Sequence, residues 1–261
     1  MVRTIFTLVA FLAFNIQATA QDFPQLRTVL QTGAVQQLNQ YAASNSEIYE
    51  FDYPATGMYW RLYRELLPGY YEGIMQIYYG APSNTEYVVH PFRIYTLVKD
   101  STIISYDMRG LDANGRYNRS IVSGKSEAEL KDFEQQFEAR FKVPLQPQFL
   151  FIDTINYGQY CGEDSLITPQ MKLVNQWVAQ KDGDSLISWL RTGNTELQLY
   201  ALAGLQQLQD EKPLSDEVIQ MVEFVLSKKG NVNICTPSHE RAAAIPLITE
   251  SFKFVPRQQT D

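Results

Sequence analysis

Two cysteines, Cys161 and Cys235, are the residues of this 261-residue chain with the clearest chemistry. In an oxidising compartment such a pair is expected to form a disulfide. Closing a loop of this length would stabilise the fold by about 4 kcal/mol on the chain-entropy model. The alternative is a cysteine nucleophile with a histidine base, because His239 follows Cys235 at short range. We predict the disulfide, which is the simpler interpretation for two cysteines in such a compartment.

Metal-binding patterns are incomplete in this sequence. His90 and His239 are the only histidines of the chain. The dipeptide His239-Glu240 begins like the helix of zinc proteases, but Ala243 stands where the second histidine belongs. A tetrahedral zinc site would have to draw its other ligands from distant positions. We therefore predict no metal site and no cofactor.

Several carboxylates lie in or near the aromatic part of the chain and are candidates for a catalytic pair. Glycoside hydrolases use two carboxylates that flank the scissile bond. The candidates are Glu50, Asp52, Glu65, Glu72, Asp107 and Asp153. A surface position without catalysis is the simpler interpretation for each of them. We predict no catalytic residue and keep a secreted hydrolase as the alternative.

Tyrosines are concentrated in one stretch, since 13 of the 16 lie between Tyr41 and Tyr117. Tyrosine and tryptophan rings stack on sugars and anchor peptides at a low cost in conformational entropy. The simpler alternative is that these rings pack the core of the first half. The candidate ligand-binding cluster is Tyr59, Trp60, Tyr63, Tyr70, Tyr71, Tyr78 and Tyr79.

The first 20 residues have the pattern of a secretory signal peptide. Arg3 supplies a positive charge, residues 5–14 are almost wholly apolar, and Ala18-Thr19-Ala20 matches the small-x-small cleavage pattern. The apolar run is too short to span a bilayer, and no second run of spanning length follows. We expect an exported protein without a membrane span that begins at Gln21 and resides in a periplasm or outside the cell.

The composition of the chain limits the kinds of partner that we expect and indicates a folded protein. A net charge of −7 repels phosphate backbones, which argues against nucleic acid. An apolar fraction of 45% is enough to build a core.

The first half of the mature chain predicts an α+β arrangement with a small, mostly antiparallel sheet. We expect helices over residues 24–42 (interrupted at Gly33), 57–67 and 126–142, the last with a capping box. Alternating apolar and aromatic residues predict strands. These strands cover residues 70–79, 87–98, 101–108 and 117–122, with a further strand or buried connector at 149–152.

The second half predicts helices alone. Helical periodicity takes over after about residue 160, and Thr168, Asn194 and Ser215 have the residue types of N-caps. A last helix is expected from about residue 238 to 250, broken by Pro246.

The segment Leu186–Leu205, LISWLRTGNTELQLYALAGL, resembles a HEAT-like repeat unit. It combines a short helix, a Gly-Asn turn and a second helix in which small Ala201 and Ala203 interrupt a leucine stripe. The resemblance implies an all-α, HEAT-like or helical-bundle second half and protein–protein contacts, and it supplies no catalytic residues. The N-terminal half resembles no named family.

These patterns predict an organisation in four parts: a signal peptide (1–20), an aromatic-rich α+β domain (21–158), a helical HEAT-like domain (159–255) and a loose tail (256–261). The leading hypothesis is a non-enzymatic binding or scaffold protein whose helical half docks a protein partner. The alternatives are a secreted hydrolase or a carbohydrate-binding module that uses the tyrosine-rich half.

Overall fold

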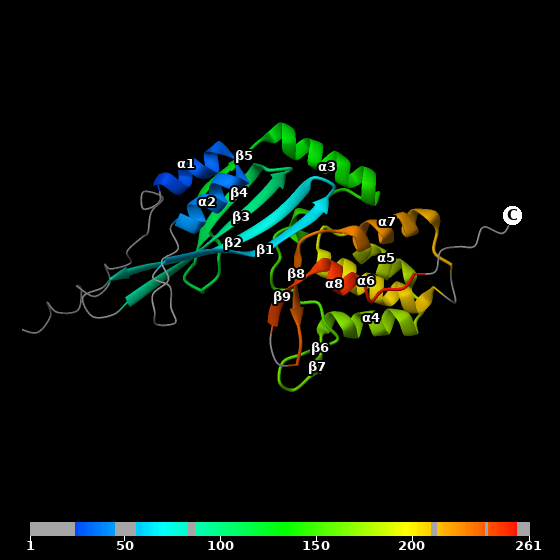
Figure 1. Ribbon diagram of the computed structural model, residues 1–261. Helices are drawn as coiled ribbons and strands as arrows, with labels where there is room; N and C mark the ends of the chain where they lie inside the picture. Colours follow the sequence, from blue (N-terminus) through cyan, green and yellow to red (C-terminus); the bar gives the residue numbers. More distant parts are fainter. Residues whose placement is uncertain (1–23, 45–55, 83–86, 210–212, 238–239, 255–261) are drawn as a thin grey trace, which may run out of the picture.

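The computed structural model describes residues 24–44, 56–82, 87–209, 213–237 and 240–254, with the backbone alone for residues 56, 79–82 and 87–90. The predicted signal peptide (1–20), the predicted tail (256–261), and the candidate carboxylates Glu50 and Asp52 lie outside the described residues. A five-stranded sheet occupies one end of the molecule and a group of helices the other (Figure 1).

The sheet is an antiparallel meander in which each strand pairs with the next along the chain. Its strands are β1 (Thr56–Leu67), β2 (Tyr70–Pro82), β3 (Tyr87–Lys99), β4 (Thr102–Gly110) and β5 (Arg119–Lys125). The strand predictions for β2, β3 and β4 are confirmed, and the prediction at 117–122 overlaps β5. The connector at 149–152 is not a strand, because a short 3-10 turn covers Pro147–Phe149.

The predicted helix over 57–67 is wrong, because these residues form β1. The register of β1 against β2 shifts between Trp60 and Leu62, so Arg61 is an extra residue in the strand. A bulge of this kind breaks the alternation of faces. Trp60 and Tyr63 consequently share one face, and their rings lie 5.1 Å apart. Apolar residues three apart in sequence imitate helical spacing.

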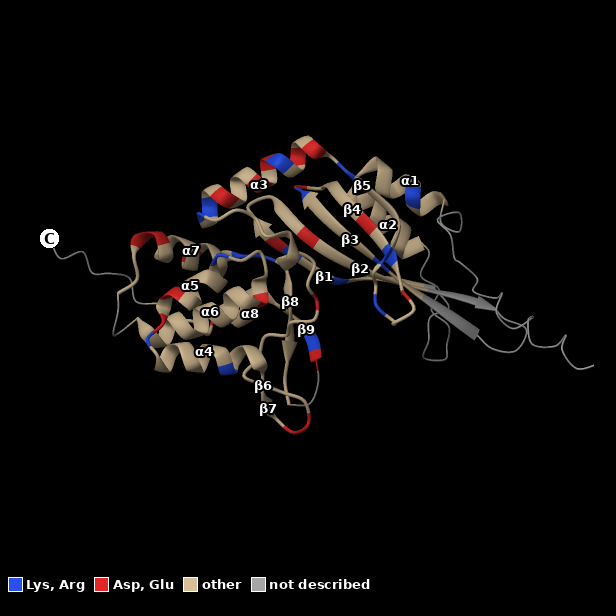
Figure 2. Ribbon diagram, turned by 180° about the vertical axis from the view of Figure 1, so that it is seen from behind, with Lys and Arg blue, Asp and Glu red and all other residues tan. Residues whose placement is uncertain are grey.

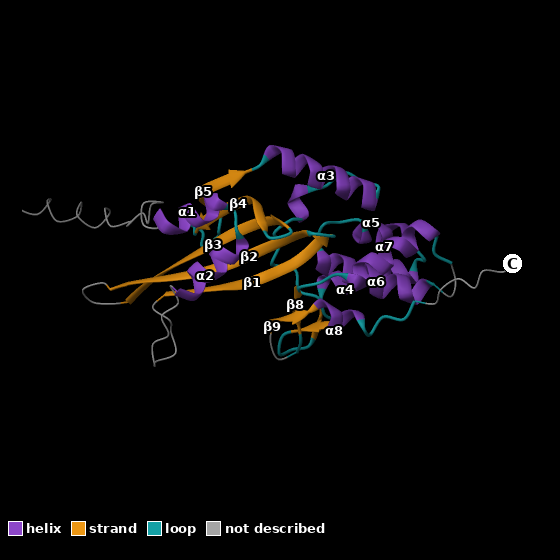
Figure 3. Cartoon of the chain, turned by 45° about the horizontal axis from the view of Figure 1, so that its top comes forward, coloured by secondary structure: helices purple, strands orange, loops and turns teal. Residues whose placement is uncertain are grey.

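Two short helices, α1 (Pro24–Thr32) and α2 (Val35–Ser44), cover one face of the sheet (Figure 3). Leu26, Leu30 and Leu38 pack there against strand residues such as Met75 and Ile94. The predicted interruption at Gly33 is confirmed, since this residue has a φ of +75° and its carbonyl accepts a hydrogen bond from the Ile103 N–H. The α1–α2 face of the sheet is therefore a conventional apolar core.

Helix α3 (Glu127–Phe141) covers part of the opposite face. Phe133, Phe137 and Phe141 form its buried stripe and pack in one cluster with Tyr70 of β2. Ser126 is the N-cap residue as predicted, but the capping-box prediction is wrong in that its side chain makes no cap hydrogen bond. Its backbone N–H donates instead to the carbonyl of Ile104, which joins the helix to β4.

The second half contains four main helices, and the three predicted N-caps are confirmed. The side chains of Thr168, Asn194 and Ser215 accept hydrogen bonds from backbone N–H groups in the first turns of their helices. The helices are α4 (Pro169–Ala179), α5 (Gly183–Leu190), α6 (Thr195–Leu208) and α7 (Asp216–Ser227). A Cβ atom added at Gly204 of α6 would lie 2.8 Å from Leu186 Cδ1, so α5 and α6 approach closely at this glycine.

The all-α prediction for this half is wrong, because it also contains two small sheets. Strands β6 (Tyr160–Cys161) and β7 (Leu166–Ile167) form one of them, and β8 (Asn231–Cys235) and β9 (Glu240–Ala244) the other.

The helix predicted from 238 to 250 is replaced by β9 and a short α8 (Ile245–Thr249). Glu240–Ala244 consists largely of strong helix formers. Pro246 nevertheless disfavours a helix that runs through it and suits the first turn of one that begins at Ile245. The preceding five residues then pair with β8, which satisfies backbone groups of that buried strand.

The two halves share one hydrophobic cluster. Tyr70 and Leu97 of the sheet, Phe137 of α3, and Leu190 and Val225 of the helical half belong to it. The backbone of residues 229–231 also lies against the edge of β1, where the Glu65 N–H donates to the Lys229 carbonyl. Among the described residues, no helix is long and apolar enough to cross a membrane.

Candidate functional site

The structure divides the predicted aromatic cluster between the two faces of the sheet. Trp60, Tyr63 and Tyr71 pack on the α1–α2 side. Tyr70 lies on the opposite face beneath α3, and Tyr59 and Tyr78 stack on each other with ring centroids 6.2 Å apart. The side chain of Tyr79 is not described. The seven residues therefore do not form one continuous platform.

The rings on the α1–α2 side have a structural explanation. A Cβ atom at Gly73 would lie 2.5 Å from Cζ3 of Trp60, so the indole covers this glycine. The indole N–H donates to Asn39 Oδ1 of α2 at 2.7 Å. Tyr63 and Tyr71 stack nearly parallel with centroids 5.4 Å apart. These contacts hold the edge of the sheet to α2.

Tyr70 is buried and belongs to the core. Its hydroxyl donates to Asp132 Oδ2 at 2.6 Å, and Lys99 Nζ donates to the same carboxylate oxygen. Burial, and then the Asp132 carboxylate, raise the pKa of Tyr70. The hydrogen bonds from Tyr70 and Lys99 lower the pKa of Asp132. This network fixes α3 to the turn end of the sheet.

The face opposite α1–α2 carries a row of polar side chains across the strands. Tyr59 of β1 pairs with Gln76 of β2, Gln76 with Arg93 of β3, and Arg93 with Arg109 of β4. Directly paired residues of antiparallel strands project on the same face. Arg93 Nε donates to Gln76 Oε1 at 3.0 Å, and Gln76 Nε2 donates to the Phe92 carbonyl. The two middle residues of the row are thus connected by a side-chain hydrogen bond as well as by register.

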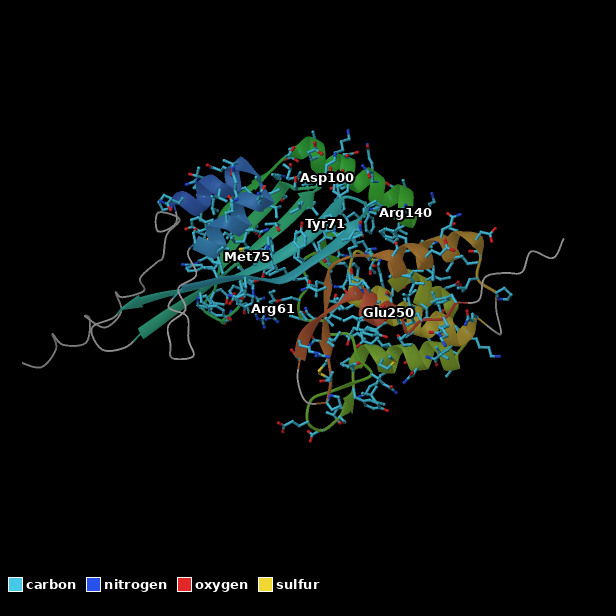
Figure 4. The ribbon with its side chains drawn as sticks, in the orientation of Figure 1. Arg61, Tyr71, Met75, Asp100, Arg140 and Glu250 are labelled. Atoms are coloured by element: carbon cyan, nitrogen blue, oxygen red, sulfur yellow. A yellow bond between two sulfur atoms is a disulfide. The ribbon has the colours of Figure 1, made fainter. Side chains whose placement is uncertain are left out.

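Arg61 joins this row because of the bulge in β1. Its Nε lies 2.9 Å from Asp153 Oδ2, and Nη1 of Arg93 lies 2.7 Å from the same oxygen. Figure 4 shows Arg61 below the sheet, on the other side from Met75. The side chain of Asp153 is 8% exposed, whereas that of Arg61 is 38% exposed. One nearly buried carboxylate therefore holds two arginines, and Arg61 still reaches solvent.

Arg109 is held in a similar way by its neighbours on β4 and β5. Its Nε donates to Asp107 Oδ2 at 2.6 Å, and Asp107 Oδ1 accepts from the Ser120 hydroxyl at the same distance. The guanidinium lies over the ring of Tyr95, 4.8 Å from its centroid, and Arg93 lies over Tyr117 at 4.0 Å. Stacking on an aromatic ring restricts each guanidinium to one plane.

We call this surface the arginine–tyrosine face. It consists of Tyr59, Arg61, Tyr78, Arg93 and Arg109, which surround the buried Gln76. Tyr59 is 48% exposed. Burial, and then a hydrogen bond with the Tyr78 hydroxyl, raise the pKa of Tyr59 to about 12. Tyr59 therefore stays neutral at physiological pH, and both tyrosines present hydroxyl groups beside the arginines.

The segment that supplies Asp153 has an unusual backbone. Phe151 has a φ of +58°, a region that bulky residues rarely adopt. Its N–H donates to Glu72 Oε2 at 2.8 Å, and its ring packs edge-on against Tyr95. Strained residues persist where their surroundings fix them, and they concentrate at functional sites. This strain directs the chain so that Asp153 meets Arg61 and Arg93.

A buried ionic cluster lies next to this segment and connects the two halves. Arg64 of β1 is completely buried, and it forms ion pairs with Glu72 of β2 and Glu196 of α6. Glu196 also accepts a hydrogen bond from the Asn233 N–H of β8. Lys228 Nζ nearby donates to Gln198 Oε1 at 2.7 Å. Burial, and then the charge of Arg64, lower the pKa of Lys228 to about 7.

The described candidates for a catalytic carboxylate pair all have other partners. Glu72 contacts Arg64, Glu65 Oε2 accepts from the Lys229 N–H, and Asp107 and Asp153 contact arginines. A glycosidase pair requires two carboxylates that face each other across a substrate cleft. No contact among the described residues supports the hydrolase hypothesis.

The predicted disulfide between Cys161 and Cys235 is present, and it joins β6 to β8 across a separation of 74 residues. The carboxylate of Glu240 lies close to these sulfurs, with potential ligand atoms within 4.8 Å of one another. Metal binding by cysteine requires thiolates, and the disulfide removes both. His239 lies outside the described residues, and the side chain of His90 is not described.

The residue pattern did not predict the three arginines of the face. Arg93 and Arg109 lie within strands that were predicted, and a charged residue inside a strand flanked by apolar residues was the available signal. Arg93 and Arg109 are neighbours because of the register between β3 and β4. Arg61 lies on the same face because of the bulge in β1. Asp153 arrives from an irregular segment with no pattern of its own.

Comparison with known proteins yields no relative. No protein-family model, no curated protein and no solved structure matches this chain. The resemblance of Leu186–Leu205 to a HEAT-like unit stays a prediction.

Proposed function

We propose that this chain is an exported, non-enzymatic binding protein that contacts a protein partner through the arginine–tyrosine face. The observation that carries the proposal is the cross-strand row Tyr59–Gln76–Arg93–Arg109, flanked by Arg61 and Tyr78. Arginine and tyrosine are enriched at the residues that supply most of the binding energy in protein interfaces.

The anchoring of these side chains supports a binding role. Each immobilised, rotamer-rich side chain costs about 0.5–1.5 kcal/mol when two proteins associate. Asp153 and Asp107 already hold Arg61 and Arg109, and Tyr59 is stacked on Tyr78. The face is therefore organised before a partner arrives, and less conformational entropy is lost on binding.

Export is part of the proposal. The pattern of residues 1–20 supports it, and the disulfide is compatible with an oxidising compartment.

Site-specific photo-crosslinking tests which surface meets the partner. The photoreactive amino acid p-benzoylphenylalanine replaces Tyr59 on the face or, as the matched control, Leu247 of α8, which is 69% exposed. Both variants are expressed and irradiated in the cells that produce the protein. We expect a discrete protein adduct from position 59 and none from position 247.

An adduct from position 247 alone would contradict the proposal and would favour docking by the helical half. The absence of a protein adduct from position 59, combined with retention of the protein on a glycan matrix, would also contradict it. That second result would favour the carbohydrate-binding alternative.

A further inference from the structure

Arg61 and Arg109 are each anchored at Nε by one aspartate. Arg109 Nε donates a hydrogen bond to Asp107, whereas Arg61 Nε forms an ion pair with Asp153 without a hydrogen bond. Their side chains are 38% and 37% exposed. Within the part of the chain that the structure describes, the terminal Nη atoms of neither arginine form a hydrogen bond or an ion pair. Each residue thus offers the outer edge of a fixed guanidinium to solvent.

The middle of the row contains an arrangement that costs stability. Arg93 and Arg109 pair directly across β3 and β4. Like charges directly opposite each other destabilise a sheet. Asp153 and Asp107 offset this repulsion, but three arginines against two aspartates leave one excess positive charge. A local conflict of this kind is expected at a functional site.

The separation of the two anchored arginines sets the size of the ligand. Arg61 lies on β1 and Arg109 on β4, which are three strand steps apart. Neighbouring strands lie about 4.8 Å apart, so β1 and β4 are roughly 14 Å apart across the sheet. Arg61 is in addition displaced along β1 by two residues from Tyr59, the β1 member of the row. An extended peptide covers the distance between the two strands in about four residues. One short segment is therefore long enough to reach both guanidinium groups.

We propose that the face recognises an acidic segment of the partner protein, with carboxylates bound by the Nη edges of Arg61 and Arg109. This inference rests on the proposed function and names its ligand class. Guanidinium edges match carboxylates in a bidentate geometry. The hydrogen-bonded pair of Tyr59 and Tyr78 hydroxyls adds one further hydrogen-bond donor beside them.

The charge distribution elsewhere supports an acidic ligand at this face rather than at other surfaces. The chain carries a net charge of −7. Figure 2 shows acidic segments on α3, at the start of α7 and in the β6–β7 loop. An acidic partner would be repelled from those surfaces, so an acidic segment has its favourable contacts where the arginines gather.

Fluorescence anisotropy with a labelled hexaglutamate peptide tests the inference on the purified, full mature protein. The test variant is the double substitution Arg61→Gln and Arg109→Gln. The matched control is Lys172→Gln with Arg241→Gln, which removes two exposed positive charges from α4 and β9. Hexaglutamine measures binding that does not depend on carboxylates. Circular dichroism confirms that all proteins are folded.

We expect hexaglutamate to bind the unsubstituted protein and the control variant equally. We expect at least tenfold weaker binding to the Arg61/Arg109 variant. Binding should weaken between about 0.01 M and about 1 M salt, because the Debye length falls from about 30 Å to about 3 Å. Hexaglutamine should not bind.

Equal hexaglutamate binding by all three proteins, or no binding by any, would overturn the inference. Binding of a sulfated oligosaccharide in place of hexaglutamate would also overturn it. These failures are distinguishable from failure of the proposed function. A protein adduct from position 59 without hexaglutamate binding would leave the binding face in place and reject only its acidic ligand.

Discussion

Arg64 of β1 and Glu196 of α6 form an ion pair in which neither side chain reaches solvent. Glu72 of β2 completes the cluster and also fixes the backbone of Phe151, two residues before Asp153. The ionic cluster that joins the helical half to the sheet is therefore linked, through the backbone of Phe151, to the segment whose Asp153 anchors Arg61 and Arg93. The helical half supports the arginine–tyrosine face in addition to any contacts of its own.

Removing Arg64 should destabilise the whole protein. The substitution Arg64→Met leaves Glu72 and Glu196 buried without their common partner, and breaking a buried ion pair typically costs about 3–5 kcal/mol. Urea unfolding measures the loss. The matched control is Arg191→Met, because the Arg191–Glu217 pair is partly exposed to solvent and should contribute less than about 1 kcal/mol. An Arg64→Met protein as stable as the control would contradict the role of the cluster.

Gly230 is the point where the helical half approaches the edge of β1. It has a φ of +105°, and a Cβ atom there would lie 2.5 Å from Arg64 Cα. Gly230→Ala should lower the free energy of unfolding by more than Gly115→Ala. Gly115 also has a positive φ, but a Cβ atom there meets no neighbour, so only a backbone cost of about 1–2 kcal/mol is expected. Equal losses in urea unfolding would show that the close approach is not required.

Lys228 should make stability depend on pH. Its pKa is about 7 in the folded protein, against an ordinary value of 10.5. Between pH 7 and pH 9 the unfolded chain binds a proton that the folded protein lacks, so the free energy of unfolding should rise with pH. Lys228→Met should reduce this slope, whereas Lys172→Met should keep it. Urea unfolding at several pH values measures the slope, and identical slopes in all three proteins would reject a neutral buried Lys228.

The disulfide should contribute substantially to stability. Replacing Cys161 and Cys235 with serine should lower the free energy of unfolding by about 4 kcal/mol, because the bond closes a loop of 74 residues. Thiol titration of the denatured, non-reduced protein should find no free thiol. Two reactive thiols would contradict the disulfide and would reopen the hypothesis of a cysteine nucleophile.

The strands and helices that the sequence predicted correctly have regular patterns. Strands β2 to β4 alternate along their length and are separated by turn residues, and the capped helices begin at Thr168, Asn194 and Ser215. The errors occur where one residue disturbs the pattern or where tertiary contacts override propensity. The bulge at Arg61 made β1 resemble a helix, and pairing with β8 turned the alanine-rich β9 into a strand.

The disulfide followed from the number of cysteines, but the candidate site did not follow from residue types. Aromatic density pointed to the correct sheet, and Tyr59 and Tyr78 do lie on the face that we propose. Trp60 instead covers Gly73, and Tyr70 lies in the core. The arginines meet only through strand register, and Asp153 reaches them through the positive φ of Phe151. None of these relations leaves a periodic pattern in the sequence.

The most direct test of the arginine–tyrosine face is quantitative capture from the envelope fraction and medium of the producing cells. Three tagged proteins are compared by mass spectrometry: the unsubstituted chain, the Arg61→Gln/Arg109→Gln variant and the Lys172→Gln/Arg241→Gln control. We predict one partner protein, recovered near one-to-one with the first and third proteins and reduced at least tenfold with the second. Equal recovery with all three proteins would contradict binding through this face.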